Sequence, residues 1–111
     1  MPRYEILLIT RALHREPLKQ VLKSACTTLL ENNAILRKVH NMGSTELPTP
    51  FRSHHKKHTH GHYFMVDVHA KISDIPRIKK EFGHEEGIIR HTFIRNRDPL
   101  VDGSNAKAPN I

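Results

Sequence analysis

The sequence is poor in the residues that mark several classes of protein. Its 111 residues include one cysteine, Cys26, which excludes an internal disulfide and any Cys-x-x-Cys redox or metal site. Tryptophan is absent and aromatic residues make up 5% of the chain, so a platform of rings for stacking bases is not expected. No apolar run approaches the roughly 18 residues that cross a bilayer, and we expect neither a secretory signal nor a transit peptide. The length predicts one domain, without a membrane span.

Carboxylates are also missing from two particular stretches. Between Glu46 and Asp67 the chain has none, and the same holds from Gly87 to Asn96. The whole chain carries 18 Lys and Arg against 11 Asp and Glu, for a formal net charge of +7. A domain this basic usually has a polyanionic partner, with nucleic acid ahead of a membrane surface. The alternative is that these basic side chains merely solvate a surface.

Half of the ten histidines stand in one run, "SHHKKHTHGHY", Ser53–Tyr63. On a strand His58, His60 and His62 alternate onto one side, and imidazole is a ligand for zinc or copper. Against a metal site, the run contains no thiol and no carboxylate, and its two lysines repel a divalent cation. Lysine, arginine and histidine can all donate hydrogen bonds to phosphate. The sequence therefore favours contact with a nucleic-acid backbone, and a histidine-rich metal-binding protein is the alternative.

The candidate contacts to nucleic acid are drawn from the basic residues of the two acid-free stretches, together with one residue just beyond the second. They are Arg52, His54, His55, Lys56, Lys57, His58, His60, Arg90, Arg95 and Arg97.

Hydrophobic periodicity predicts the element order β-α-β-β-α-β. Strands are expected over residues 2–10, 34–43, 62–70 and 87–95, a first helix from Pro17 to about Asn33, and a second from Ser73 or Asp74 to Gly83. This order is typical of an α+β ferredoxin-like βαββαβ sandwich, a four-stranded antiparallel sheet with two helices on one face. We place the domain at residues 1–97 and an extended or disordered tail at 98–111.

Several finer expectations concern which side chains are buried. Phe64, Val66, Val68 and Ala70 share one face of the third strand, which we expect to be the covered one. In the last strand Ile88 and Ile94 compete with Ile89 and Phe93 for the inward face, and the pattern does not decide. The first helix carries an apolar stripe, which we expect to be buried: Leu18, Val21, Leu22, Ala25, Cys26, Leu29 and Leu30.

Three further expectations concern local backbone features. Gly83 is expected to end the second helix, because glycine suits the position after a C-cap. Pro48 and Pro50 should interrupt strand pairing, because proline lacks the N–H donor. The histidine run is expected as a loop or an irregular extension of a strand.

An enzyme is the least favoured class. Small ferredoxin-like phosphatases cradle phosphate in a glycine-rich loop after the first strand, and the corresponding "RALHRE", residues 11–16, has no glycine. No spacing of serine, histidine and acid suggests a nucleophile with its base. We predict no catalytic residue, no cofactor, no metal and no small-molecule substrate.

Four stretches, in order, resemble the family of small-subunit ribosomal protein six: "PRYEILLIT", "NMGSTELPTPF", "GHYFMVDVHA" and "GIIRHTFIR". The similarity covers about residues 2–97. The starts of the first and third stretches, Pro2–Glu5 and Gly61–Phe64, look most like the mitochondrial branch of that family.

The resemblance implies a structural, non-enzymatic component of the small-subunit platform that binds rRNA and pairs with ribosomal protein S-eighteen. It implies a mitochondrial location, with a bacterial or plastid ribosome as the alternative. Arg3 matches a basic residue at the family's chain start and Arg90 the arginine of its last strand, although either can instead be an ion-pair residue that supports the fold. Residues 50–62 occupy the family's basic connection between the second and third strands.

Overall fold

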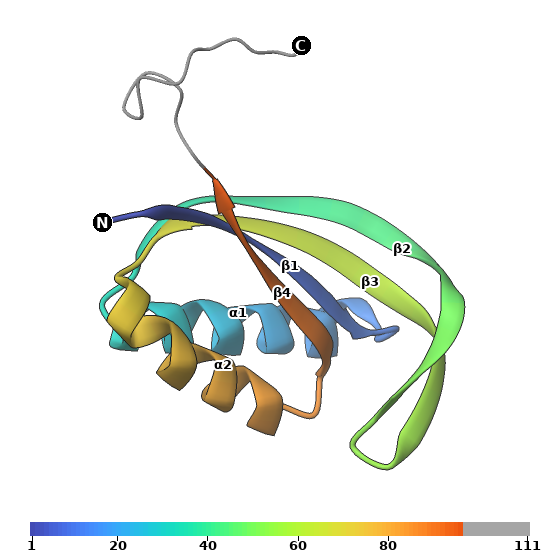
Figure 1. The fold of residues 1–111 in the computed structure, drawn as a ribbon. Helices are drawn as coiled ribbons and strands as arrows, with labels where there is room; N and C mark the ends of the chain where they lie inside the picture. The colour runs from blue at the N-terminus through green and yellow to red at the C-terminus, as the bar shows by residue number, and fades with distance from the viewer. Residues whose placement is uncertain (97–111) are drawn as a thin grey trace, which may run out of the picture.

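The computed structural model describes residues 1–96, and the elements follow the predicted order (Figure 1). They are β1 (Arg3–Arg11), α1 (Arg15–Glu31), β2 (Ile35–Ser53), β3 (Lys56–His69), a 3-10 turn (Ile72–Asp74), α2 (Ile75–His84) and β4 (Ile88–Asn96). The strands form one sheet in the order β2-β3-β1-β4, and every neighbouring pair is antiparallel. This is the predicted ferredoxin-like arrangement. Arg97 and the predicted tail, residues 98–111, lie outside the described residues.

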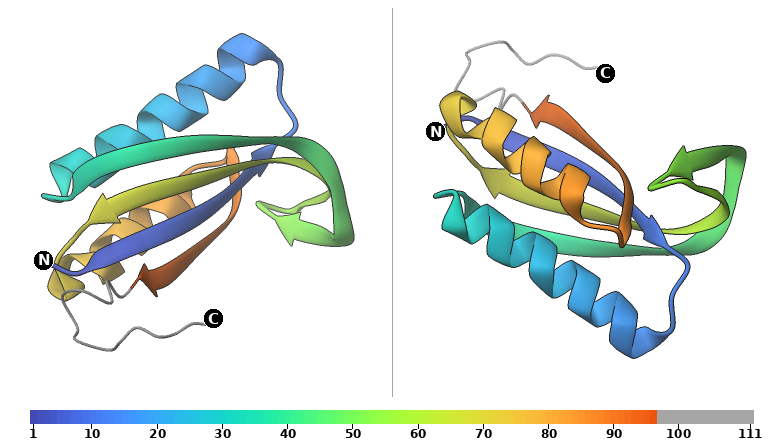
Figure 2. Two further views of the ribbon diagram at one scale, coloured as in Figure 1. Left: turned by 90° about the horizontal axis from the view of Figure 1, so that it is seen from above. Right: turned by 90° about the horizontal axis from the view of Figure 1, so that it is seen from below.

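Both helices lie on the same side of the sheet, and the opposite face is left uncovered (Figures 1 and 2). The main core fills the space between these layers. On β3, Phe64, Val66 and Val68 are at most 2% exposed, which confirms the predicted inward face. They pack with Ile6 and Leu8 of β1 and with side chains from the helices, among them Leu29, Ile78 and Phe82.

The ends of α1 follow from local sequence. Pro17 stands in the first turn, where its missing N–H leaves no partner unsatisfied. Asn33 follows the C-cap with φ 66°, a left-handed conformation that asparagine tolerates better than most residues. The predicted apolar stripe is wrong at its edges, because Leu30 is 57% exposed and Cys26 is only half-buried. Burial still raises the pKa of the Cys26 thiol, which keeps it protonated and unreactive.

The second helix ends one residue later than predicted. Asp74 occupies the N-cap position, and its carboxylate accepts from the guanidinium of Arg77 rather than from the backbone of the first turn. Gly83 lies inside the helix, and the last helical residue is His84. The prediction that Gly83 stops the helix was therefore wrong.

The sequence left undecided which side chains of β4 point toward the helices. In the structure the inward side changes within the strand, at a β-bulge. Phe93 and Ile88 contact the main core, whereas Ile89 belongs to a second cluster on the other face. The cause is a register shift in the pairing with β1 between Ile9 and Thr10, which places one extra residue in β4. A strict alternation cannot describe a strand that changes face at such a bulge.

Candidate nucleic-acid interface

The histidine run forms the tip of a long β-hairpin that extends beyond the rest of the sheet (Figure 2). Arg52 pairs with Lys57, and Ser53 pairs with Lys56. The turn between them consists of His54 and His55, both with positive φ, 51° and 65°. Two successive left-handed residues are the geometry of a two-residue hairpin turn whose twist matches that of the strands.

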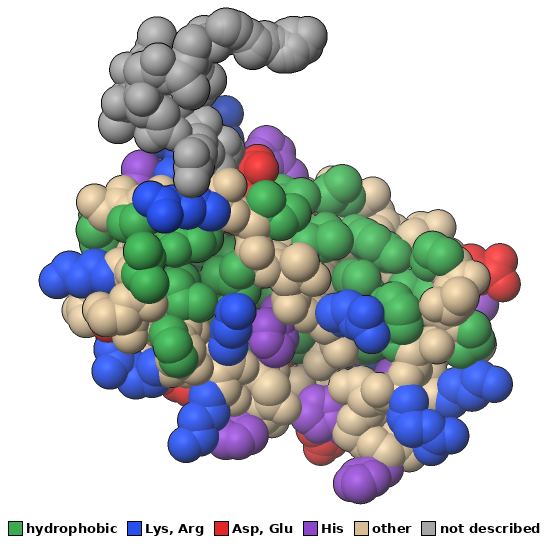
Figure 3. Space-filling view, in the orientation of Figure 1, with side chains coloured by type: hydrophobic (Ala, Val, Ile, Leu, Met, Phe, Trp, Pro, Cys, Tyr) green, Lys and Arg blue, Asp and Glu red, His purple; other side chains and the backbone are tan. Residues whose placement is uncertain are grey.

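This hairpin brings most of the predicted nucleic-acid residues together. Seven of them lie within its tip: Arg52, His54, His55, Lys56, Lys57, His58 and His60. Figure 3 shows lysine, arginine and histidine side chains gathered at the lower right, where Figure 1 places the hairpin tip. Among residues 1–96 no ion pair engages the side chains of Arg52, Lys56 or Lys57. Their positive charges are therefore exposed to solvent and not paired with a carboxylate.

A small second hydrophobic cluster lies at the base of the hairpin, on the sheet face opposite the helices. Ile9, Leu47 and Ile89 are at most 9% exposed, and Phe51 and Tyr63 pack against them. Pairing of β2 with β3 skips from Glu46 to Phe51, which confirms that the two prolines between them interrupt it. The strand nevertheless continues, and Leu47 points from this unpaired stretch into the cluster. The hairpin is therefore held in place by side-chain packing against β1 and β4 as well as by backbone pairing between its own two strands.

Gly61 allows this close approach. A Cβ at this position would lie 2.8 Å from Cγ2 of Ile9, 3.2 Å from Cδ2 of Leu47 and 3.2 Å from the backbone oxygen of Thr10. A larger residue would push the hairpin away from β1, so the absence of a side chain is a steric requirement here.

Arg90 lies on the same face and caps the second cluster. Its guanidinium carbon is 4.0 Å from the ring centroid of Phe51, a cation–π contact between β4 and the hairpin. The residue is exposed, so one side of the guanidinium remains available to solvent. The structure thus adds Arg90 to the border of the hairpin group.

Arg3 and Arg95 lie at the opposite end of the sheet from the hairpin tip. The register pairs Arg3 with His69 and Arg95 with Tyr4, whereas the hairpin flanks the other end of β1. The Nε and Nη2 of Arg3 donate to both carboxylate oxygens of Asp67, at 2.9 and 2.7 Å. This hydrogen-bonded partner holds the pKa of Asp67 below its ordinary value despite burial. The geometry favours the fold-supporting role of Arg3, and the predicted residues therefore form two separate groups.

The metal alternative finds no ligand set in the described part of the chain. Within residues 1–96 no group of three or more histidine, cysteine or acidic side chains could hold an ion. His62 is turned toward Asn41, with its Nε2 2.6 Å from Oδ1, and stacks on Phe64 at 4.6 Å. Burial lowers the pKa of His62. Sharing one face of a strand does not bring the three alternating histidines together, because neighbours two residues apart are separated by nearly 7 Å.

The structure adds one residue that the sequence analysis missed. Arg11, at the end of β1, lies opposite Gly61 and lines an open hollow of about 350 Å³ together with Ala12 and the hairpin residues 56–60. No motif marks this arginine, and it stands 45 residues before Lys56 in the chain. Only the pairing register, which the sequence does not reveal, brings the two together.

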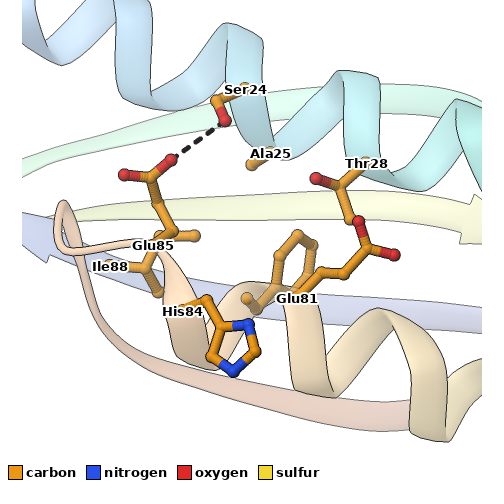
Figure 4. Close-up of a pocket in the computed structure, with 8 residues that line it drawn as sticks. Ser24, Ala25, Thr28, Glu81, His84, Glu85 and Ile88 are labelled. Carbon is orange, nitrogen blue, oxygen red and sulfur yellow. Dashed lines mark hydrogen bonds between the residues drawn. The ribbon is translucent and has the colours of Figure 1, made fainter.

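A second hollow, of about 240 Å³, lies between the two helices (Figure 4). Its floor includes Ala25, Phe82 and Ile88, and Ser24 Oγ donates to Glu85 Oε2 at 2.9 Å. The imidazole of His84 points away from Ser24, so it does not stand beside this serine as a base.

None of the helices in residues 1–96 is long and apolar enough to span a membrane.

Comparison with known proteins places these features in context. The family model described as Ribosomal protein S6 matches residues 3–95. Small ribosomal subunit protein bS6m of Gallus gallus is 37% identical over 95 residues, 86% of this chain and 78% of that protein. The protein of the same name from Drosophila melanogaster is 32% identical over 89% of this chain and 67% of its own length.

Solved structures show the same fold. The crystal structure of 30S ribosomal protein S6 from Thermotoga maritima superposes with a TM-score of 0.75 at 18% identity, covering 92% of each chain. The C-terminal domain of the MgtC protein from Mycobacterium tuberculosis gives a TM-score of 0.57 at 9% identity, over 86% of this chain and 88% of that one. At these identities the likeness concerns the fold alone.

Proposed function

The chain belongs to the ribosomal protein S6 family, and on that premise we propose that its basic hairpin binds small-subunit rRNA. The protein is a structural component of the small ribosomal subunit and not an enzyme. Its relatives from bird, mammal and fly all carry the mitochondrial name bS6m, and the protein is located in the mitochondrial ribosome. Two of its surfaces are suited to bind partners there: the basic hairpin and the uncovered face of the sheet.

The observation that carries the rRNA proposal is the concentration of unneutralised positive charge on a fixed hairpin. The tip presents Arg52, Lys56 and Lys57 with no carboxylate in the chain from Leu47 to Val66. Cations that are already gathered and ordered attract a polyanion while little side-chain and loop entropy is lost. The packed second cluster supplies this order, because it fixes the base of the hairpin against β1 and β4.

The hairpin suits the phosphate backbone rather than the bases. Of its aromatic side chains, Phe51 is covered by Arg90, and Tyr63 is partly buried in the second cluster. No open row of rings is therefore presented to bases on this part of the described surface, and recognition rests on charge and shape.

The test replaces Arg52, Lys56 and Lys57 with glutamine and measures binding to an in vitro transcript of the small-subunit rRNA at several salt concentrations. Each lost phosphate contact reduces the log–log salt slope by roughly 0.7 to 0.9. The matched control replaces the exposed Lys23, Lys71 and Lys80 on the helix side, which removes the same total charge. An equal reduction in both variants would show that net charge, and not the hairpin, drives association.

We assign the uncovered sheet face to a protein partner, the homologue of ribosomal protein S-eighteen. This face exposes Ile35 by 54% and Ile94 by 46%, with the half-buried Leu7 and Met65 between them in the sheet. Removing the apolar part of this face from water favours association with a partner. The expected result is that Ile94→Glu weakens binding of the purified partner homologue while the hairpin triple variant does not. The reverse pattern would place the partner on the hairpin.

A further inference from the structure

Arg11 is placed unlike the other arginines near the hairpin. It is the last residue of β1, and its backbone N–H donates to the carbonyl oxygen of Gly87 at 2.9 Å, so its main chain is held between β3 and the residue that precedes β4. Its side chain is half-buried, yet within residues 1–96 no hydrogen bond or ion pair engages the guanidinium. The guanidinium is therefore available to donate to an external acceptor.

The surroundings of Arg11 are hollowed and basic. The hollow of about 350 Å³ has the end of β1, with Arg11 and Ala12, on one side and the hairpin on the other. The hairpin side carries Lys56, Lys57 and the imidazoles of His58 and His60, so every ionisable side chain that lines it is basic. Its volume is at the lower end of the range for ligand sites, and its open form admits a segment of a polymer from the side.

We propose that this hollow binds a backbone phosphate of RNA and that Arg11 is its innermost ligand. The inference rests on the proposed function and adds to it a defined site, assembled from two distant parts of the chain. The planar guanidinium matches two phosphate oxygens at once, whereas the lysines act as point charges at the rim. Because Arg11 projects from a paired strand, its position is fixed before binding.

An internal ion pair is the competing explanation for Arg11. Glu86 lines a smaller adjoining space, about 10 Å³, that also touches Arg11, His54 and Lys56. Among the described residues no salt bridge joins Glu86 to any of these side chains, and this carboxylate does not line the larger hollow. The larger hollow is therefore left to an external anion.

The experiment compares three single variants of the full chain in binding to the small-subunit rRNA transcript. Arg11→Gln removes the charge and the planar fork, Arg11→Lys keeps the charge only, and Lys80→Gln removes an exposed charge from α2 on the helix side. We expect Arg11→Gln to reduce the log–log salt slope by about 0.7 to 0.9 and Lys80→Gln to leave it unchanged. Arg11→Lys should keep the slope while binding more weakly than the unmodified protein.

Two controls separate local from global effects. Thermal unfolding of each variant establishes that it is folded at the temperature of the assay. Titration with inorganic phosphate, followed by the ¹⁵N resonance of Arg11 Nε, reports the site without RNA, and a saturable shift is expected. A shift absent at Arg11 would overturn the proposal.

The outcomes also separate this inference from the broader one. If Arg11→Gln binds RNA like Lys80→Gln while the hairpin triple variant loses slope, the hairpin binds RNA without Arg11 and the phosphate site at Arg11 is overturned. If the unmodified chain shows no salt-dependent RNA binding, this site and the proposed function both fail.

Discussion

The two hydrophobic clusters of the molecule differ in what they hold together. Within residues 1–96 the main core contains 14 buried residues and joins β1, β3 and β4 to both helices, with Leu36 of β2 packed against it. The second cluster has three, on the opposite face, and joins the hairpin to β1 and β4. The first is large enough to determine whether the chain folds. The second is too small for that, and its position shows that it orients one surface element.

The residues that stabilise the fold are thus separate from those that orient the hairpin. Disrupting the main core should unfold the whole domain, because its residues come from every layer. Disrupting the second cluster should release the hairpin while the remaining sheet persists, since local openings in proteins follow the boundaries of packed units.

The largest effect is expected from Phe82→Ala. The ring is 1% exposed and packs in the main core, and deletion of such a side chain costs about 3 to 5 kcal/mol. Urea denaturation should show a lower midpoint, with helix and sheet signals lost together. A change confined to the hairpin would contradict the assignment of Phe82 to the cooperative core.

Leu47→Ala should have a smaller and more local effect, about 2 kcal/mol, because the cavity opens near the surface and can partly collapse. Hydrogen exchange should accelerate in the paired residues Phe51 and His58 and remain slow at Val66 and Val68. RNA binding should weaken although no charge has been removed. Uniform acceleration across the sheet would show that the two clusters unfold as one unit.

Arg3→Gln tests whether the far end of the sheet is structural. Loss of the paired guanidinium leaves the carboxylate of Asp67, 7% exposed, without its partner, at a cost of about 2 kcal/mol. Because the folded-state pKa of Asp67 is lowered, the pair adds stability above the ordinary carboxyl pKa, and this stability is lost as pH falls through the folded value. The variant should therefore lose less stability on acidification. Unchanged stability with weaker RNA binding would instead make Arg3 an rRNA contact.

The smallest effect concerns His91 at the edge of the main core. Burial, with Lys79 nearby, lowers the pKa of this imidazole, so the unfolded chain takes up its proton at a higher pH than the folded one. Stability should thus fall as pH drops below about 6.5. His91→Gln should flatten that fall, whereas substitution of the exposed His84 should not. Equal slopes for the two variants, measured by urea denaturation at pH 7.5 and 5.5, would count against a half-buried neutral His91.

The parts of the fold that follow regular periods could be predicted from the sequence. The alternation of Phe64, Val66 and Val68 identified the inward face, and the three-and-four spacing of α1 identified its buried side, with errors only at the edge residues. The order of elements then left few topologies. The bulge that splits Ile88 from Ile89 was not predictable, because the pattern there is apolar in either register.

The candidate site was predictable in charge and not in shape. The run of lysines and histidines contains no apolar pattern that would indicate strand register. The pairing of Arg52 with Lys57 is set by the turn at His54 and His55 and cannot be read from composition. The same limit hid Arg11, whose neighbours are determined by strand register. It also gave no way to separate Arg3, at the start of β1, from Arg52, in the hairpin beyond the other end of β1. The distance between Arg3 and Arg52 follows from how the strands pair in the sheet, which the sequence does not show.

The unequal lengths of the two hairpin strands carry a last consequence. Between the pairs Glu46–His60 and Phe51–His58, β2 advances five residues while β3 advances two. The extra residues in β2 make the hairpin bend. Leu47 lies in this longer stretch, and its side chain packs in the second cluster. The direction in which the charged tip points is therefore determined by the number of residues in β2 between Glu46 and Phe51. Deleting one residue between Glu46 and Phe51 would re-aim the hairpin without altering a single charge.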